Sequence, residues 1–584
     1  MFTKDCKIFF FVVKLIRFLR LENILKRKLY NEIKIESFRQ LLDLYKNKYK
    51  DDIAFEFRDD PNSMDFTKIT YEQFAKDVEA LGASLLKHKV KRVALISPNR
   101  YEWCVSYLAI TTAGLVAVPL DKSLPGNEIE GLLERSKADA IIYAKKYEDS
   151  VSKCKVKICM DDNSYTNLLE EGYKISHDDY DNVEVDTNSM SIMLFTSGTT
   201  SIAKAVMLSQ HAICHNLTSY SMIYRVPRQS KYLSFLPLHH TFESTITFLY
   251  GTSIGLCICF CDGLKYISKD LVDYQIDGFV CVPLMLEIMY KKIIKNIKAE
   301  GKEEVVNRMR KLFRHAPIAI RRKVFKQIID GLGGHLRYIV SGGAPMDRET
   351  LQGYSDFGID IVQGYGLTET CAGIIIENKK SKRVGSIGVG FTNNEYAIDN
   401  PDKDGIGELK IKSESVMLGY YENDDLTKEV IKDGWFYTGD LGYQDKDGFF
   451  FITGRKKDMI VLKNGKKIFP EELEILINKL PYVSESMVFG HVDDTKKDRN
   501  EDVVLYAKIV YDKNNIKKYF PDEKDYHDVI FEDIKNKINK QMPAYKYIRK
   551  ILVTDLPLIK TTTQKIKRND EMKLIESEIK EQNQ

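Results

Sequence analysis

The feature that most constrains the fold of this 584-residue chain is an alternation of short apolar runs with helical stretches. Residues 71–87 have apolar side chains at helical spacing, whereas residues 93–98, 115–121 and 138–144 are short apolar runs between helical stretches. Such alternation predicts a largely parallel sheet that helices cover on both faces.

A second series of apolar runs begins at residues 191–195 and continues through YLSFLPL, IGLCICF, DGFVCVP and LRYIVSGG. A long, highly charged helical stretch at about residues 287–329 interrupts this series of apolar runs. It is interpreted as an insertion on the outside of this second unit. After about Gly385 the runs become short and are broken by Gly, Asp and Asn, which favours a small antiparallel barrel.

The sequence predicts a domain boundary at the charged turn GRKKD, residues 454–458. The predicted fold class is α/β: a large N-terminal domain of two doubly wound α/β subdomains plus a small β-barrel, followed by a mobile α+β C-terminal domain. The predicted segments are residues 1–36, a basic amphipathic N-terminal segment, residues 37–456, and a C-terminal cap at residues 457–584.

Charge and cysteine content narrow the possible partners. Lys plus Arg number 88 and Asp plus Glu 84, so the net charge is +4, and a balance this small gives no nucleic-acid signature. The ten cysteines form no zinc-ribbon or CxxC redox pattern, and their density is far below that of a disulfide scaffold. The simplest interpretation is a protein of the reducing cytoplasm.

The N-terminal segment is the one bulk basic feature. Residues 8–16, IFFFVVKLI, fall short of the roughly 18 to 20 apolar residues of a transmembrane helix, and no signal-peptide cleavage site follows. On a helical projection Lys4, Lys7, Lys14 and Arg17 gather on one side, as in helices that lie on anionic membranes. A helix docked on the protein's own surface is the alternative, so peripheral contact with the inner face of the membrane stays open.

The run at residues 191–195 continues directly into TSGTTSIAK, residues 196–204. Small hydroxyl residues and a glycine after a buried strand place backbone N–H groups, hydroxyls and one ammonium where phosphate oxygens could bind. The segment is therefore a phosphate-loop candidate, although it lacks the two glycines of the Walker pattern. A solvated turn is the alternative for such a loop in isolation.

Six further motifs follow in order: LPLHHTFE (236–243), SGGAP (341–345), QGYGLTET (363–370), GWFYTGDLG (434–442), GRKKD (454–458) and KTTTQKIKR (560–568). With this order and spacing the chain resembles the adenylate-forming enzymes, and among them the AMP-forming long-chain fatty acid–CoA ligases. The resemblance covers roughly residues 41–568.

The resemblance implies a two-step reaction that uses ATP, Mg²⁺ and CoA. A fatty acid carboxylate attacks the α-phosphate of ATP, pyrophosphate leaves, and a thiol then displaces AMP from the acyl adenylate. Two anions approach each other in the first step, so the site has to supply positive charge and hydrogen-bond donors.

The resemblance also implies roles for individual residues. Lys565 reaches the carboxylate and the α-phosphate, Glu369 is the metal ligand, and Thr368 offers a hydroxyl to phosphate. The implied nucleotide-binding residues are Thr196, Ser197, Gly198, Thr199, Thr200, Lys204, Gly342, Gly343, Ala344, Tyr365, Gly366, Thr368, Asp440, Arg455 and Lys565.

Three further positions follow from the family's motifs. His240 resembles the aromatic residue that lines the acyl site. Glu243 is the only acidic side chain of the LPLHHTFE segment, which favours a carboxylic acid substrate without an amino group. Lys457 is the expected hinge between two domain orientations. Gly465 corresponds to the glycine beside the pantetheine arm of CoA.

The chain departs from the family pattern at four positions where the family usually has glycine or proline. This chain has Ser201, Ala203, Ala205 and Gln564 there. Glycine matters where the backbone needs a positive φ, so these changes could alter loop closure. Two alternatives to the CoA ligase therefore stay open: an enzyme that passes the acyl group to an acyl carrier protein, and a non-catalytic nucleotide- or acyl-binding protein on the same fold.

Overall fold

The computed structural model describes residues 29–152, 154–196, 203–378, 382–462, 466–492, 503–561 and 565–582. The chain forms two compact units. Unit 1 comprises residues up to 396 together with 411–436 and 445–450, and unit 2 comprises residues 397–410, 437–444 and 451–584. The domain boundary that the sequence predicts after Lys456 divides the chain differently from these two units, and it stays a prediction.

The first sheet of unit 1 has the strand order β18-β8-β7-β4-β3-β5-β6. Its five strands from β7 to β6 are parallel, and β8 and β18 add an antiparallel edge. Its strands are β3 (Arg92–Ile96), β4 (Val116–Pro119), β5 (Ala140–Tyr143), β6 (Val156–Cys159), β7 (Met190–Thr196), β8 (Lys204–Ser209) and β18 (Gly419–Tyr420).

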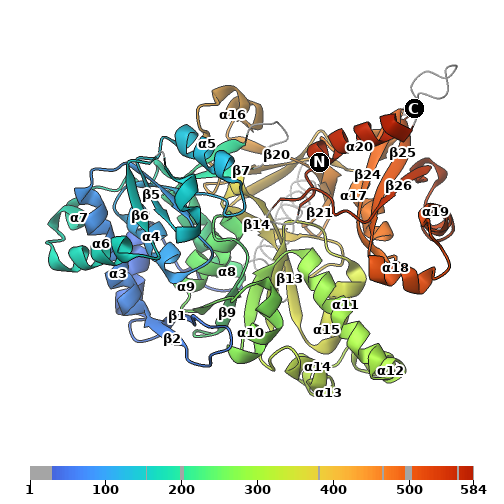
Figure 1. Cartoon of the computed structure of the whole chain (residues 1–584), viewed down its shortest axis with the longest axis horizontal. Helices are drawn as coiled ribbons and strands as arrows, with labels where there is room; N and C mark the ends of the chain where they lie inside the picture. The colour runs from blue at the N-terminus through green and yellow to red at the C-terminus, as the bar shows by residue number, and fades with distance from the viewer. Residues whose placement is uncertain are drawn as a thin grey trace, which may run out of the picture. The chain divides into compact units, whose positions relative to one another are not determined.

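Helices cover both faces of this sheet, as the alternating sequence predicts (Figure 1). On one face α5 and the short 3₁₀ turn at Lys145–Ser150 bury apolar side chains against Ile96, Val118 and Ile141. The other face packs on α4. The helices of this layer are α3 (Tyr71–Lys87), α4 (Tyr101–Thr112), α5 (Gly126–Ser136), α6 (Asn163–Lys174) and α7 (Asp178–Asn182).

Helix α4 joins the two sheets of unit 1. Eleven of its twelve residues are buried, and a helix that is apolar all round belongs inside a protein. Its Trp103 and Tyr107 rings lie 6.5 Å and 6.2 Å from the ring of Phe248, which belongs to a helix of the second sheet's layer. The hydroxyls of Thr111 and Thr112 donate hydrogen bonds to the carbonyls of Tyr107 and Leu108, respectively, in the same helix.

The second sheet runs β2-β1-β10-β9-β11-β12-β13-β14-β15 within unit 1. Strands β1, β10, β9, β11, β12 and β13 are parallel, and β2, β14 and β15 are antiparallel to their neighbours. The strands are β1 (Ile53–Phe57), β2 (Thr67–Thr70), β9 (Lys231–Ser234), β10 (Cys257–Phe260), β11 (Gly278–Cys281), β12 (Tyr338–Gly342), β13 (Asp360–Leu367), β14 (Ala372–Ile376) and β15 (Gly388–Gly390).

The helices of this second layer are α2 (Phe38–Asn47), α8 (Gln210–Ile223), α9 (Gly251–Ser253), α10 (Ile267–Asp273) and α15 (Arg348–Phe357), together with a π-helical segment at Phe242–Tyr250. The strands that follow along the chain are β16 (Glu395–Asp399), β17 (Gly407–Lys412), β19 (Ile431–Lys432), β20 (Trp435–Gln444) and β21 (Phe449–Arg455), with helix α16 (Asp424–Val430). The antiparallel strand β15 continues the second sheet beyond β14 and pairs with Phe449 and Phe450.

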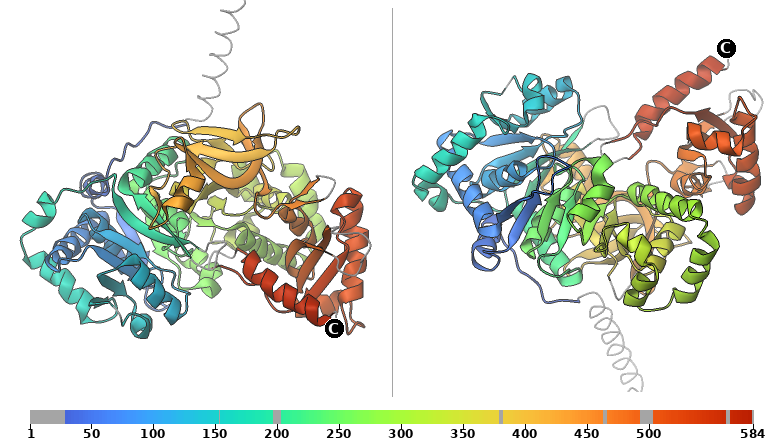
Figure 2. Two further views of the ribbon diagram at one scale, coloured as in Figure 1. Left: turned by 90° about the horizontal axis from the view of Figure 1, so that it is seen from above. Right: turned by 60° about the horizontal axis from the view of Figure 1, so that its bottom comes forward.

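The charged stretch predicted as a helical insertion is helical. It forms α11 (Pro283–Ala299), α12 (Glu303–Phe313), α13 (Ile318–Val324) and α14 (Lys326–Asp330), which lie outside the second sheet (Figures 1 and 2). Helix α12 buries none of its residues. Its Arg310 holds it to α15 through an ion pair of 3.1 Å with the fully buried Asp356.

Unit 2 contains an α+β module, as predicted. The antiparallel pair β24 (Val483–Val492) and β25 (Val503–Tyr511) takes β26 (Lys550–Thr554) as a parallel third strand. Alternate residues face two separate cores: Val488 and Ala507 lie in one, and Met487 and Tyr506 in the other, which α20 covers (Figure 1). The remaining elements are β22 (Ile460–Val461), β23 (Lys467–Ile468), α17 (Pro470–Ile477), α18 (Lys513–Tyr519), α19 (His527–Asp533) and α20 (Arg568–Gln582).

Among the described helices, none combines the length and the apolar character that crossing a membrane requires. The N-terminal residues 1–28, on which the membrane-contact prediction rests, lie outside the described residues.

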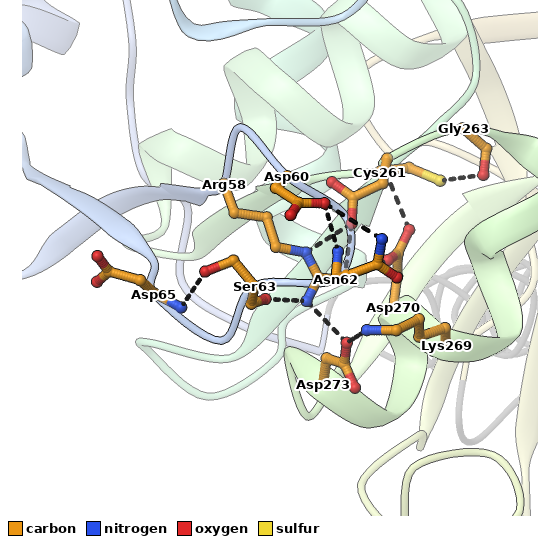
Figure 3. Close-up of polar contacts among 11 residues, drawn as sticks. Arg58, Asp60, Asn62, Ser63, Asp65, Cys261, Gly263, Lys269, Asp270 and Asp273 are labelled. Carbon is orange, nitrogen blue, oxygen red and sulfur yellow. Dashed lines mark hydrogen bonds and ion pairs between the residues drawn. The ribbon is translucent and has the colours of Figure 1, made fainter.

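A buried ionic cluster ties β1 to β10 and α10 at one end of the second sheet (Figure 3). The fully buried guanidinium of Arg58 donates to Asp262 at 2.7 Å, to Asp273 at 2.7 Å and to Asp270 at 3.0 Å. Burial and the neighbouring Asp262 raise the pKa of Asp270 to about 6. Arg58 is therefore the counter-charge for three closely spaced carboxylates.

We expect Arg58→Ala to reduce the free energy of unfolding by about 3–5 kcal/mol, because it leaves buried carboxylates without a counter-charge. The loss should be smaller at pH 5.5 than at pH 8. Without the guanidinium the folded-state pKa of Asp270 rises further, and its protonation at low pH then relieves the repulsion among the carboxylates. Thermal unfolding at the two pH values measures both effects.

Lys269→Ala is the matched control, because it removes only a partly exposed partner of Asp273. Its effect should stay below about 1 kcal/mol. Equal effects of Arg58→Ala and Lys269→Ala would contradict the assigned role of Arg58.

Candidate active site

The predicted motifs of unit 1 meet at one edge of the second sheet. Strands β9, β11, β12 and β13 are adjacent and parallel, so the segments that follow their carboxyl ends lie side by side. These segments are LPLHHTFE after β9, SGGAP at the end of β12, and QGYGLTET within and after β13. In sheets of this kind ligands bind outside the carboxyl ends of the strands.

Asn99 brings the carboxyl end of the first sheet to the same place. It follows β3, and its amide donates to the hydroxyl of Ser234 at 3.0 Å and to the carbonyl of Leu236 at 2.6 Å. Its side-chain oxygen accepts from the N–H of Leu238 at 3.2 Å. One side chain of the first sheet thus fixes the loop that carries the two histidines.

Glycine is required at several points of this edge. A Cβ on Gly366 would lie 1.7 Å from the carbonyl oxygen of Ala372, so no other residue fits there. Gly343 has φ +85°, a left-handed conformation that other residues rarely adopt. At Gly342 the ring of Phe242 is 3.1 Å from the position of a Cβ, so the HHTFE and SGGAP segments are in contact.

The phosphate-loop candidate joins two strands of a hairpin. Thr196 at the end of β7 pairs with Lys204, which is the first residue of β8. The Nζ atom of Lys204 lies 5.1 Å from the centre of the Tyr420 ring, in reach of a cation–π interaction. The hydroxyl of Tyr420 donates to Oε1 of Glu369 at 2.8 Å. Tyr420 therefore connects the predicted phosphate lysine with the predicted metal ligand.

The turn that carries Thr368 and Glu369 is held tightly. The Thr370 hydroxyl accepts from the N–H of Leu367 at 3.0 Å, and the Asn216 amide donates to the carbonyl of Gly373 at 2.9 Å. After this turn Ala372 has φ +102°, an unusual conformation for a residue with a side chain. Such strained backbone persists where the surroundings fix it, and it is often found at functional sites.

Two of the predicted nucleotide-binding residues, Asp440 and Arg455, lie in unit 2. Asp440, on β20, is 3% exposed, and its Oδ1 atom lies 3.1 Å from Nε of Arg455 at the end of β21. The hydroxyl of Thr438 accepts a hydrogen bond from the N–H of Asp440 at 3.1 Å. The structure thus brings the two side chains together.

Lys457 and Lys565, the predicted hinge and catalytic lysine, are both exposed residues of unit 2. Lys457 lies in the turn directly after β21. The backbone carbonyl of Lys565 accepts from the N–H of Thr561 at 2.8 Å, and its N–H donates to the Thr561 hydroxyl at 3.1 Å. These two bonds fix the backbone of Lys565 against Thr561.

Several predicted positions lie outside the described residues: Ser197, Gly198, Thr199, Thr200, Ser201, Gly465 and Gln564. Of the two remaining departures, Ala205 is buried on β8 opposite Phe195, and Ala203 packs partly against the same core. Both alanines contribute apolar contacts to the first sheet.

Sequence reasoning missed Tyr420, Asn99 and Asp121. Asp121 follows β4, and its Oδ1 atom lies 3.5 Å from Nε2 of His239, next to the predicted His240. Each of these residues follows or ends a short strand, which was the available signal. The sequence pattern did not indicate which distant motif each of them contacts.

Comparison with protein-family models matches residues 43–421 to the AMP-binding enzyme model and residues 457–583 to the AMP-binding enzyme C-terminal domain. The chain belongs to the AMP-binding enzyme family. The resemblance to AMP-forming acyl-CoA ligases and the mixed α/β fold with a separate C-terminal domain are thereby confirmed.

Relatives of this AMP-binding enzyme include the long-chain-fatty-acid–CoA ligase FadD15 of Mycobacterium bovis, which is 27% identical over 74% of this chain and 78% of its own length. Among solved structures, a Mycobacterium tuberculosis fatty acyl CoA synthetase matches with a TM-score of 0.63 at 22% identity, covering 92% of this chain and 98% of the other. An O-succinylbenzoate coenzyme A synthetase from Bacillus subtilis, in complex with ATP and magnesium ion, matches with a TM-score of 0.69 at 20% identity, over 91% and 99% of the two chains. At these identities the structures establish the fold.

A buried acid lies beside the histidine loop of this AMP-binding enzyme. Glu243 is fully buried in the π-helical segment, and burial raises its pKa to about 8. The Thr247 hydroxyl donates to its Oε2 atom at 3.0 Å. Glu243 is thus largely protonated at neutral pH, which suits an apolar surrounding.

This pKa makes the stability of the protein depend on pH. Because the pKa of Glu243 is higher in the folded protein than in the unfolded chain, the folded state alone holds the proton between about pH 4.5 and pH 8, and stability falls as the pH rises through this window. We expect Glu243→Gln to remove a decrease of about 3–4 kcal/mol between pH 5 and pH 8. Chemical unfolding across this range measures it.

Glu170→Gln is the control for the Glu243 experiment, since its side chain is 66% exposed on α6. It should leave the pH dependence of the wild-type protein unchanged. A Glu243→Gln variant with the wild-type pH dependence would refute a buried, protonated Glu243.

Proposed function

We propose that this protein activates a fatty acid with ATP and transfers the acyl group to CoA. The observation that carries the proposal is the contact of Tyr420 with both Lys204 and Glu369, together with the histidine loop that Asn99 holds at the carboxyl edge of the second sheet. The relatives at 25–27% identity that are named as long-chain fatty acid–CoA ligases support this substrate class.

The first step joins the acid to AMP. A carboxylate oxygen of the fatty acid bonds to the α-phosphorus of ATP, and the bond to pyrophosphate breaks. In the proposed mechanism Lys204 neutralises the phosphate end, and Lys565 supplies the second ammonium. Fixed positive groups of this kind stabilise the charge that develops as two anions meet.

In the second step the sulfur of CoA bonds to the acyl carbon, the bond to AMP breaks, and the thiol proton leaves. We propose that Lys457 is the hinge and that Gly465 admits the pantetheine arm. Asp440 and Arg455 are proposed to hold the ribose, with Tyr365 against adenine and Gly342, Gly343 and Ala344 beside it.

The residues at Thr368 and Glu369 fit Mg²⁺, because hydroxyl and carboxylate oxygens are the hard ligands that this ion prefers. When bound, Mg²⁺ neutralises phosphate charge. Glu369 is half-buried, and the Tyr420 hydroxyl orients its carboxylate. A solved relative of the same fold holds ATP and a magnesium ion, which supports both cofactors.

The acyl acceptor and the cellular location of the protein are separate proposals. CoA is the proposed acceptor, with an acyl carrier protein as the alternative. The nine cysteines in the described part of the chain are all free thiols, in keeping with the proposed cytoplasmic location. Contact of residues 1–36 with the membrane also stays a proposal.

The direct test incubates the pure protein with ATP, Mg²⁺, CoA and fatty acids of increasing chain length. We expect AMP and acyl-CoA as products. Acyl-AMP that accumulates with CoA, yet is consumed by an acyl carrier protein, would favour the alternative acceptor. Binding of ATP without pyrophosphate exchange, for any acid, would point to a non-catalytic protein.

We expect Tyr420→Phe to raise the Mg²⁺ concentration needed for half-maximal pyrophosphate exchange about 10-fold. The ring stays over Lys204, but the carboxylate of Glu369 loses its orienting hydrogen bond, and partners of metal ligands typically contribute 10- to 100-fold. Tyr421→Phe is the matched control, since the Tyr421 hydroxyl accepts from Arg92 at 2.9 Å. Equal Mg²⁺ requirements in both variants would exclude the proposed role of Tyr420.

We expect Lys565→Ala to reduce pyrophosphate exchange at least 100-fold, because one of the two ammonium groups opposing the anionic repulsion is lost. Lys567→Ala, two residues further along the same basic segment, should retain most of the activity. Exchange rates at saturating ATP separate the two variants. A loss of equal size in both would indicate a general effect of basic charge.

A further inference from the structure

Asp121, His239 and His240 form a side-chain cluster that the proposed reaction does not use as a unit. Their ligand atoms all lie within 4.8 Å of one another. Among the residues that the structure describes, this is the one group of three His, Cys, Asp or Glu side chains close enough to hold a metal ion together. The rings of His239 and His240 have their centres 4.2 Å apart.

The buried nitrogen of His239 is the second observation. The His239 side chain is 7% exposed, and its Nε2 atom is buried without a hydrogen-bond partner. This nitrogen lies 3.5 Å from Oδ1 of Asp121. An unpaired buried polar atom in a native structure calls for an explanation, and an ion is one of the few available.

The backbone of the cluster is fixed before any ion binds. The N–H of His240 donates to the carbonyl of Pro237 at 3.0 Å, and the carbonyl of His240 accepts from the N–H groups of Glu243 and Ser244 at 3.1 Å and 3.0 Å. Asn99 holds Leu238 from the other sheet. A site on such rigid supports loses little entropy when it binds an ion.

We propose that Asp121, His239 and His240 bind a divalent transition-metal ion, Zn²⁺ foremost. Two imidazole nitrogens and one carboxylate oxygen form the donor set of zinc sites that keep an open position. The same donors select Zn²⁺, Co²⁺ or Ni²⁺ over Mg²⁺, which prefers oxygen ligands alone. The site is therefore distinct in chemistry from the Mg²⁺ position proposed at Glu369.

Bound Zn²⁺ would hold the ring of His240 in one place. This consequence rests on the proposed function, in which His240 lines the acyl site. Because the ion would also occupy space beside the histidine loop, we expect Zn²⁺ to inhibit acyl-CoA formation. The site would thus act as an inhibitory metal site on the acid side of the reaction.

The test titrates the full-length protein with Co²⁺ and with Zn²⁺ in the presence of excess Mg²⁺. We expect one equivalent of Co²⁺ to give visible d–d absorption without thiolate charge-transfer bands, and Zn²⁺ to displace it. The absence of thiolate bands matters because Cys261, the one partly exposed thiol among the described cysteines, is a competing soft ligand. Displacement of the bound Co²⁺ by Mg²⁺ at equal concentration would overturn the proposal.

Asp121→Asn and His239→Gln should each weaken Zn²⁺ binding at least 10-fold. His211→Gln is the matched control, since His211 pairs with Glu414 at 2.7 Å on the surface. This variant shows how the loss of an ordinary histidine–carboxylate pair affects Zn²⁺ binding. Asp121→Asn preserves the size of the side chain and its ability to form hydrogen bonds. Thermal unfolding checks that this variant folds. Equal affinities of the wild-type protein and Asp121→Asn would refute the site.

Inhibition is measured separately, with the free Zn²⁺ concentration fixed by a metal buffer. We expect half-maximal inhibition of acyl-CoA formation to need at least 10-fold more Zn²⁺ in Asp121→Asn than in the wild-type protein. An enzyme that forms no acyl-CoA at all would refute the proposed function while the metal titration could still be interpreted. Zn²⁺ bound at one equivalent without inhibition would refute the inhibitory role.

Discussion

The candidate site depends on a constraint that neither sheet of unit 1 meets alone: the carboxyl ends of both have to face the same space. Asn99, directly after β3, makes three hydrogen bonds to the segment Ser234–Leu238 that leaves β9. The buried helix α4 fills the space between the sheets with Trp103 and Tyr107. With both contacts in place, loops from two sheets can contribute to one set of polar groups.

Charge in this protein is concentrated in clusters, although the net charge of the chain is only +4. Arg58 pairs with three aspartates at one end of the second sheet, while Lys204 and Glu369 both contact Tyr420. Glu243 avoids the cost of a buried charge by keeping its proton. Arg58, Lys204, Glu369 and Glu243 therefore each have a counter-charge, a contacting ring, a hydrogen-bond partner or a raised pKa.

The histidine loop combines two kinds of group within five residues. The ligand atoms of His239 and His240 lie close to that of Asp121, whereas Glu243 is fully buried and accepts a hydrogen bond from Thr247. π-Helical turns often mark functional positions, because the extra residue in the turn changes the direction of the side chains that follow. Metal binding at the histidines and acyl binding nearby would then share one short stretch of backbone.

The sequence by itself determined the α/β fold class and the order of the motifs, because hydrophobic periodicity and motif spacing are local patterns. The roles of the charged residues Lys204, Glu369, Asp440, Arg455 and Lys565 stay predictions from the resemblance. The resemblance implies a nucleotide-binding role for both Asp440 and Arg455, and the structure brings the two side chains together. Only the tertiary structure revealed Tyr420 between Lys204 and Glu369, Asn99 between the two sheets, and Asp121 beside His239. Those contacts join residues more than 50 positions apart, and a local pattern carries no information about which distant strand end will become its neighbour.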